Sequence, residues 1–127
     1  MTVILYHFTN EKNLDSIMAE GIKPSGYDTT PPYRVVWLTR SETPTWTLDP
    51  RKRWACRLRI VVRHGDRKLV KWESWMRKHY RDVYDELMQT DRIFRKACPT
   101  TWCYFDTIPP TAVREITHCN YDMVIVD

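Results

Sequence analysis

Glycine is scarce in this chain, which has only three among 127 residues. Loops that hold phosphate groups need several glycines at fixed spacing, because the backbone must approach the phosphate closely. Neither GxGxxG nor GxxxxGK followed by Ser or Thr occurs in the sequence. A dinucleotide-binding fingerprint and a P-loop are therefore excluded as the basis of any function.

Paired cysteines and long apolar runs are also missing. The four cysteines form no CxxC pair, and their spacing to His118 fits no common zinc module, so no metal site is expected. No apolar run approaches the roughly 20 residues of a membrane span. The first residues become polar too early for a signal peptide. We therefore expect a cytoplasmic protein with reduced thiols and no membrane partner.

Apolar and aromatic residues are plentiful by comparison. Hydrophobic residues make up 43% of the chain and aromatic residues 13%, with six tryptophans. This content is sufficient for a packed core, and the length fits one domain over residues 1–127.

The hydrophobic patterns predict an α+β fold. A short helix is expected from Leu14, Ile17 and Met18, which share one helical face, and Gly21 is placed to end it. A longer central helix is expected over residues 72–88, where Trp and Met recur at helical spacing. The strongest strand pattern is the alternation over 55–63. The expected strands are residues 3–8, 34–39, 55–63, 68–71, 102–106 and 121–126.

Positive charge is concentrated in one segment. Residues 51–71 contain nine Lys or Arg and one acid, Asp66, whereas the chain as a whole carries a formal charge of +4. Such a basic segment can attract a nucleotide, a nucleic acid or an acidic protein, and it can equally be a solvated strand and turn. DNA, RNA and a protein target remain open as its partners.

His7 and Thr9 are the first candidate binding residues. Strand alternation places them on one face and Tyr6 and Phe8 on the other. A polar pair at a strand end, next to the start of a helix, can hydrogen-bond a ribose or an amide. The alternative is a histidine that bonds only to nearby backbone.

The opening Tyr6-His7-Phe8-Thr9, followed by Asn13-Leu14, Ile17 and Gly21-Ile22-Lys23-Pro24, resembles that of DarT-type DNA ADP-ribosyltransferases. It is also similar, more distantly, to the opening of RNA 2′-phosphotransferases. The resemblance implies the ADP-ribosyltransferase fold, in which a split pair of small sheets grips NAD. It also implies that His7 and Thr9 lie against the nicotinamide-side ribose and amide, with His7 contributing to catalysis.

Two later segments extend the resemblance. Val36-Trp37-Leu38-Thr39 resembles the second-strand motif of this fold, which implies that Trp37 and Thr39 contact the cofactor. Residues 102–106, 108–110 and 113–116 resemble its late strand and closing turn. The catalytic acid of the fold would fall near Trp102, where the sequence has none, so Glu115 is the candidate acid and Trp102 a candidate NAD contact.

Two arginines complete the candidate set. Arg57 and Arg59 share one face of the strand expected over 55–63. A guanidinium aimed at a cleft can hold a pyrophosphate with two parallel hydrogen bonds.

Three functions follow from these patterns. The first is an NAD-using enzyme that transfers ADP-ribose to a nucleic acid or a protein, as a toxin or a phage or mobile-element factor would. The second is a non-catalytic member of the same fold that binds a nucleotide or a partner protein. The third is a basic nucleic-acid-binding domain without a nucleotide pocket.

Overall fold

The computed structural model describes residues 1–26, 31–43 and 54–121. It is an α+β structure built on one antiparallel sheet with the strand order β5-β6-β3-β1-β4-β7, to which the short β2 is added beside β3. The strands are β1 (Thr2–Thr9), β2 (Ser25–Gly26), β3 (Arg34–Thr39), β4 (Trp54–Arg63), β5 (Leu69–Lys71), β6 (Thr101–Tyr104) and β7 (Val113–Tyr121).

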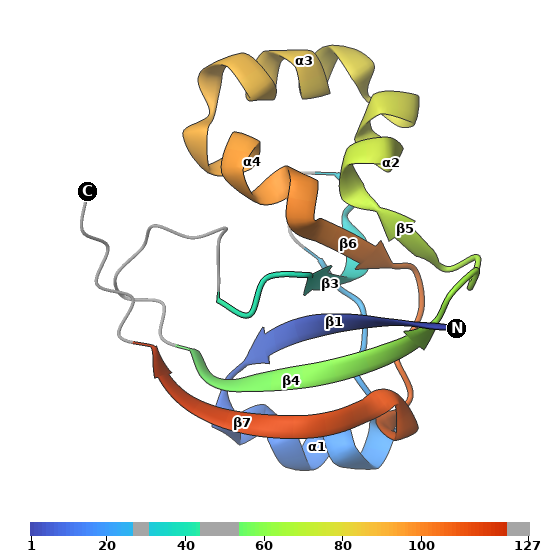
Figure 1. The fold of residues 1–127 in the computed structure, drawn as a ribbon, viewed down its shortest axis with the longest axis vertical. Coiled ribbons are helices and arrows are strands. Elements are labelled where there is room, and N and C mark those ends of the chain that lie inside the picture. The colour runs from blue at the N-terminus through green and yellow to red at the C-terminus, as the bar shows by residue number, and fades with distance from the viewer. Residues whose placement is uncertain (27–30, 44–53, 122–127) are drawn as a thin grey trace.

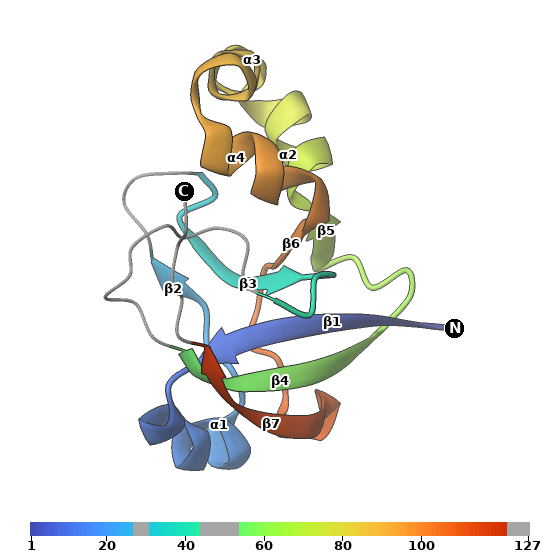
Figure 2. The ribbon, with the colours of Figure 1, turned by 60° about the vertical axis from the view of Figure 1, so that its left-hand side comes forward.

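Four α-helices accompany the sheet in the described ranges. They are α1 (Leu14–Glu20), α2 (Trp72–His79), α3 (Arg81–Thr90) and α4 (Arg92–Ala97). Single 3₁₀ turns precede α1, β6 and β7, namely η1 (Glu11–Asn13), η2 (Cys98–Thr100) and η3 (Pro110–Ala112). Helices α2, α3 and α4 lie at one end of the molecule and α1 at the other (Figures 1 and 2).

The sheet is nearly divided between β1 and β3. Strand β1 pairs with β4 along its whole length, from Thr2 to Thr9. Its pairing with β3 is confined, in the described part, to Tyr6 opposite Thr39. The sheet thus consists of one half made of β1, β4 and β7 and another made of β3, β5 and β6, joined at this narrow junction.

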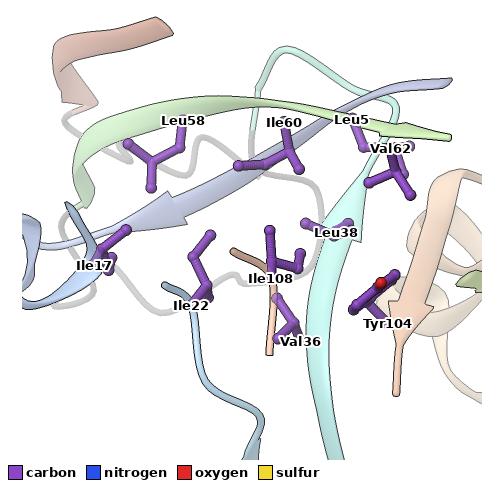
Figure 3. Packing of buried hydrophobic residues seen from close by; sticks show 10 residues of the cluster. All are labelled: Leu5, Ile17, Ile22, Val36, Leu38, Leu58, Ile60, Val62, Tyr104 and Ile108. Carbon is purple, nitrogen blue, oxygen red and sulfur yellow. The ribbon is translucent and has the colours of Figure 1, made fainter. Parts of the chain in front are cut away.

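One face of the sheet, which we call the core face, buries most of the apolar side chains. Its centre is formed by β1, β3 and β4, and α1 closes it from below through Ile17 (Figure 3). Ile22 and Ile108 exchange two backbone hydrogen bonds of 2.8 and 2.9 Å beneath the strands. The cluster comprises Leu5, Ile17, Ile22, Val36, Leu38, Leu58, Ile60, Val62, Tyr104 and Ile108.

The opposite side, which we call the outer face, differs between the two halves. Over β3 and β6 it is covered by α2, α3 and α4, which form a second core. Over β1 and β4 the outer face carries the residues that alternate along each strand with those of the core face. One of them, Ile4, is exposed. The second core comprises Val35, Trp72, Met76, Tyr84, Phe94, Cys98 and Cys103.

Gly21 ends α1, as its position after the helical pattern predicts. Its φ is +89°, in the region that favours glycine. A Cβ at this position would lie 2.2 Å from the backbone oxygen of Ile108. The chain therefore needs glycine here both for its backbone angle and for the close approach that lets Ile22 pair with Ile108.

The prediction of one long helix over residues 72–88 is wrong. Tyr80 has φ −142° and ψ 53°, and it separates α2 from α3. In α3 Tyr84 is buried, whereas Val83 is 37% exposed. Helix α4 was also not predicted. Asp91 caps it by accepting a hydrogen bond from the Phe94 amide at 3.0 Å.

The strand predictions that fall on described residues agree with the structure. The expected strands at 3–8, 34–39, 55–63, 68–71 and 102–106 are found as β1, β3, β4, β5 and β6 with shifts of at most two residues at their ends. The expected strand at 121–126 lies almost wholly outside the described residues. Strand β7 was missed because its exposed positions Arg114, Glu115 and His118 hide the strand pattern.

No helix in the described ranges is long and apolar enough to cross a membrane.

Candidate functional site

The junction of β1 and β3 holds His7. Beyond the Tyr6–Thr39 pair, the two strands stop exchanging backbone pairs, and the His7 ring bridges them through Nδ1, 2.9 Å from the carbonyl oxygen of Trp37. Because a carbonyl only accepts, Nδ1 must carry the proton and donate it. The proton-free Nε2 is then an acceptor, and no partner for it occurs among the residues that the structure describes.

The protonation state of His7 follows from its surroundings. Burial lowers its pKa below the ordinary value of 6.5, and the hydrogen bond to the Trp37 carbonyl opposes this effect only in part. His7 is therefore neutral near pH 7. A neutral imidazole with a fixed tautomer presents one defined acceptor atom, which suits recognition of a hydroxyl or an amide N–H.

Thr9 and Thr39 have their hydroxyl oxygens engaged locally. Thr9 accepts from Asn13 Nδ2 at 3.1 Å, where β1 leads into η1. Thr39 accepts from the Ser41 amide at 3.0 Å. Both side chains are buried, on opposite faces of the sheet, since Thr39 pairs with Tyr6 and Thr9 alternates with Phe8. Each hydroxyl keeps its proton to donate.

Trp37 lies on the outer face beneath α2. Its ring meets the edge of Trp72 with centroids 5.0 Å apart. Its Nε1 is buried and has no hydrogen-bond acceptor within the described ranges. A buried N–H without a partner is uncommon and costs about 1–3 kcal/mol.

The remaining candidates lie away from His7. Arg57 and Arg59 are on the outer face of β4, opposite Thr117 and Glu115 of β7. The Arg57 guanidinium donates to the Glu42 carbonyl at 3.1 Å and lies 5.1 Å from the Tyr6 ring centroid. Glu115 is exposed, whereas His7 is two strands away on the core face.

The start of β6 carries no acid. Thr101 is buried opposite Thr39 and donates to the Ala97 carbonyl at 2.7 Å. Trp102 is half-buried on the core face, and the Lys71 ammonium lies 5.4 Å from its ring centroid. This placement puts Trp102 on the far side of the sheet from Trp37. The two tryptophans therefore do not flank one common space.

Two hollows on the described surface lie away from the predicted residues. One lies between the end of β4 and the segment before β7, and the other lies at the turn between α2 and α3. Neither is lined by His7, Trp37 or Arg59. Among residues 1–26, 31–43 and 54–121, no three His, Cys, Asp or Glu side chains are placed to hold a metal ion.

The cysteines do not form a nucleophilic site in the described structure. Burial raises the pKa of Cys98 to about 12, and it also raises that of Cys103. Cys56 is fully buried, with its Sγ 3.7 Å from His118 Nδ1.

The side chains of the basic segment do not gather at one place in the described structure. Arg57, Arg59 and Arg63 follow the outer face of β4, Lys68 pairs with Asp106, and residues 51–53 lie outside the described residues.

Sequence reasoning missed two polar contacts near these residues. The Tyr6 hydroxyl donates to Glu42 Oε1 at 3.4 Å, and the Tyr104 hydroxyl donates to Asp66 Oδ2 at 2.8 Å. No local pattern could have revealed them, because each joins residues more than 30 positions apart.

Comparison with known proteins finds no matching family model, no matching curated protein and no matching solved structure.

Proposed function

We propose that this protein has an ADP-ribosyltransferase-type fold and binds NAD or a related nucleotide at the junction of β1 and β3. The observation that carries the proposal is the fixed tautomer of His7, whose Nε2 is left as an acceptor at the place where the two strands separate. A ribose hydroxyl is a donor suited to that atom.

One further feature supports the proposal. The sheet has two halves that meet at one described residue pair, which agrees with the split sheets that the sequence resemblance implies. The indole N–H of Trp37 does not add to this support, because the Trp37 ring lies on the outer face against Trp72, on the other side of the sheet from His7.

The same placements favour binding over transfer of ADP-ribose. A transferase needs an acid near the reacting ribose carbon, to stabilise positive charge or to activate the acceptor. The start of β6 offers Thr101 instead, and Glu115 is separated from His7 by two strands and by the thickness of the sheet. We therefore propose that the protein functions by binding a nucleotide and not by transferring ADP-ribose.

Calorimetric titration of NAD into the unchanged protein and two variants tests the proposal. His7→Asn keeps an N–H near the Nδ1 position to donate to Trp37 but removes the Nε2 acceptor, so binding should weaken by at least about tenfold while the fold is retained. His64→Asn, in the exposed turn after β4, is the matched control and should bind like the original protein.

Two results would contradict this proposal. Equal NAD affinity of His7→Asn and the unchanged protein would restrict His7 to a structural role. Transfer of label from NAD to a macromolecule would show that an acid outside the described residues, or one reached by rearrangement, completes a catalytic site.

A further inference from the structure

A hollow lies beside the end of β4, where this strand runs past the start of β7. The described register of β7 begins with Val113 opposite Ile60, so residues 61–63 of β4 extend beyond it. The hollow lies between these residues and the segment 108–112, and its volume is about 140 Å³. Pockets that hold drug-sized ligands measure roughly 300–1,000 Å³, so this hollow suits a molecule smaller than a nucleotide.

The polar part of the lining is built around the carboxylate of Asp66. Its Oδ1 accepts a hydrogen bond from the Lys68 amide at 2.9 Å, and its Oδ2 accepts one from the Tyr104 hydroxyl at 2.8 Å. The bond from the Lys68 amide is the main cause that lowers the pKa of Asp66, so the group is a carboxylate near pH 7. Each carboxylate oxygen can accept a further hydrogen bond, and so can the Tyr104 oxygen, which has donated its proton. The hollow therefore offers a negative charge in a fixed orientation, which suits an ammonium group.

A positive charge lies near this carboxylate without pairing with it. Arg63 also lines the hollow, and its guanidinium lowers the pKa of Asp66, although less than the hydrogen bond from the Lys68 amide does. Within the described part of the chain, Arg63 forms an ion pair neither with Asp66 nor with another acid, whereas the Lys68 ammonium is paired with Asp106. Two opposite charges that share one hollow without touching are complementary to a small molecule that carries both charges.

The rest of the lining is apolar. Val62 contributes from the core face of β4, and Ile108 and Pro109 contribute from the segment before η3. Val62 and Ile108 belong to the core cluster, and Figure 3 shows them in the same part of it as Tyr104. A small apolar group placed in the hollow is removed from water against these side chains.

We propose that this hollow binds a free α-amino acid with a small apolar side chain. Asp66 and Tyr104 accept hydrogen bonds from its ammonium group, Arg63 donates to its carboxylate, and its side chain lies against Val62 and Ile108. A free amino acid carries both charges on one carbon atom, whereas either end of a peptide carries only one of them. The site is separate from the junction of β1 and β3 and does not depend on the nucleotide proposal.

Titration of L-valine into the isotope-labelled protein, followed by NMR, tests the proposal. The amide signals of residues 63–68 and of Ile108 should shift saturably at millimolar valine, whereas those of residues 78–83, at the other hollow, should not. Two analogues of valine each lack one charge. Isobutylamine, without the carboxylate, and 3-methylbutanoate, without the ammonium group, should each bind at least about tenfold more weakly than valine.

Three variants separate this site from general charge attraction. Arg63→Gln removes the guanidinium from an exposed position, and Asp66→Asn removes the negative charge while keeping an oxygen for the Lys68 amide. Each should weaken valine binding at least about tenfold. Arg67→Gln is the matched control, because Arg67 is exposed in the same turn but does not line the hollow, and it should bind valine like the unchanged protein. Thermal unfolding confirms that the variants are folded.

Three results would overturn the proposal. One is the absence of saturable shifts in these signals up to about 20 mM valine, which would show that the hollow does not take an amino acid. Another is binding of isobutylamine as tight as that of valine, which would reduce the site to one for an amine or a peptide amino terminus. A third is an equal loss of binding in Arg63→Gln and Arg67→Gln, which would assign the effect to the charge of the turn as a whole.

Discussion

The two halves of the sheet use the same outer face differently. In the half formed by β3, β5 and β6, helices α2, α3 and α4 cover that face with a second core. In the half formed by β1, β4 and β7, the helices do not extend over it, and Arg59 and Glu115 face each other across neighbouring strands. One half is thus stabilised from both sides, whereas the other depends on its core face.

This contrast explains why the junction between the halves is a suitable place for a site. The two halves share the core on the core face, where Leu5 and Leu58 belong to the same cluster as Leu38, so side-chain packing joins them where β1 and β3 exchange few backbone pairs. The side chain of His7 takes the place of a backbone pair there by bonding to Trp37. A junction held by a side chain leaves a polar atom available to a ligand, whereas a continuous ladder would pair all of its polar backbone groups.

The largest expected effect compares the two faces of β4. Leu58 is fully buried on the core face, so Leu58→Ala should destabilise the protein by about 2–5 kcal/mol. Val61, on the outer face of the same strand, is only half-buried, and Val61→Ala should cost less than about 1.5 kcal/mol. Urea denaturation of both variants measures the difference. Equal losses would show that the outer face of this half is packed as tightly as the core face.

A smaller effect is expected at the two glycines with positive φ. Gly21→Ala places a Cβ against the Ile108 carbonyl, so backbone strain and the displacement of Ile108 together should cost about 2–4 kcal/mol. Gly65, with φ +90°, has no atom near the added Cβ, and Gly65→Ala should cost only the strain of about 1–2 kcal/mol. Thermal unfolding compares the two variants. If Gly65→Ala were the more damaging, the close approach of Gly21 to Ile108 would not be important for stability.

The fold could be predicted from the sequence where one strand or helix carries its own pattern. The alternation of residues 55–63 correctly placed Leu58 on the core face and Arg59 on the outer face. The break at Tyr80 was missed because the apolar spacing of α2 continues approximately into α3, and spacing does not reveal a change of direction. Strand β7 was missed because it is an edge strand whose exposed residues are charged.

The candidate site was less predictable, because its geometry depends on how separate strands meet. Alternation placed His7 and Thr9 on one face, but it could not show that β1 and β3 separate after Tyr6. It also could not show that the Trp37 ring lies under α2, on the opposite side of the sheet from Trp102. Whether these residues bind NAD remains a prediction.

The smallest expected effect is the pH dependence that His7 contributes at the junction. Burial lowers the pKa of His7 below 6.5, so protonation is harder in the folded chain than in the unfolded chain. Below pH 6.5 the unfolded state therefore binds more protons than the folded state. The stability that neutral His7 contributes is fully present above that pH and is lost as the pH falls.

His7→Asn, which cannot titrate, should lose less stability than the unchanged protein from about pH 7 to about pH 5. Urea denaturation at both pH values measures the difference, with His64→Asn as the control. A pH dependence unchanged in His7→Asn would mean that His7 can be protonated without loss of its bond to Trp37, and that the junction of β1 and β3 is open to water.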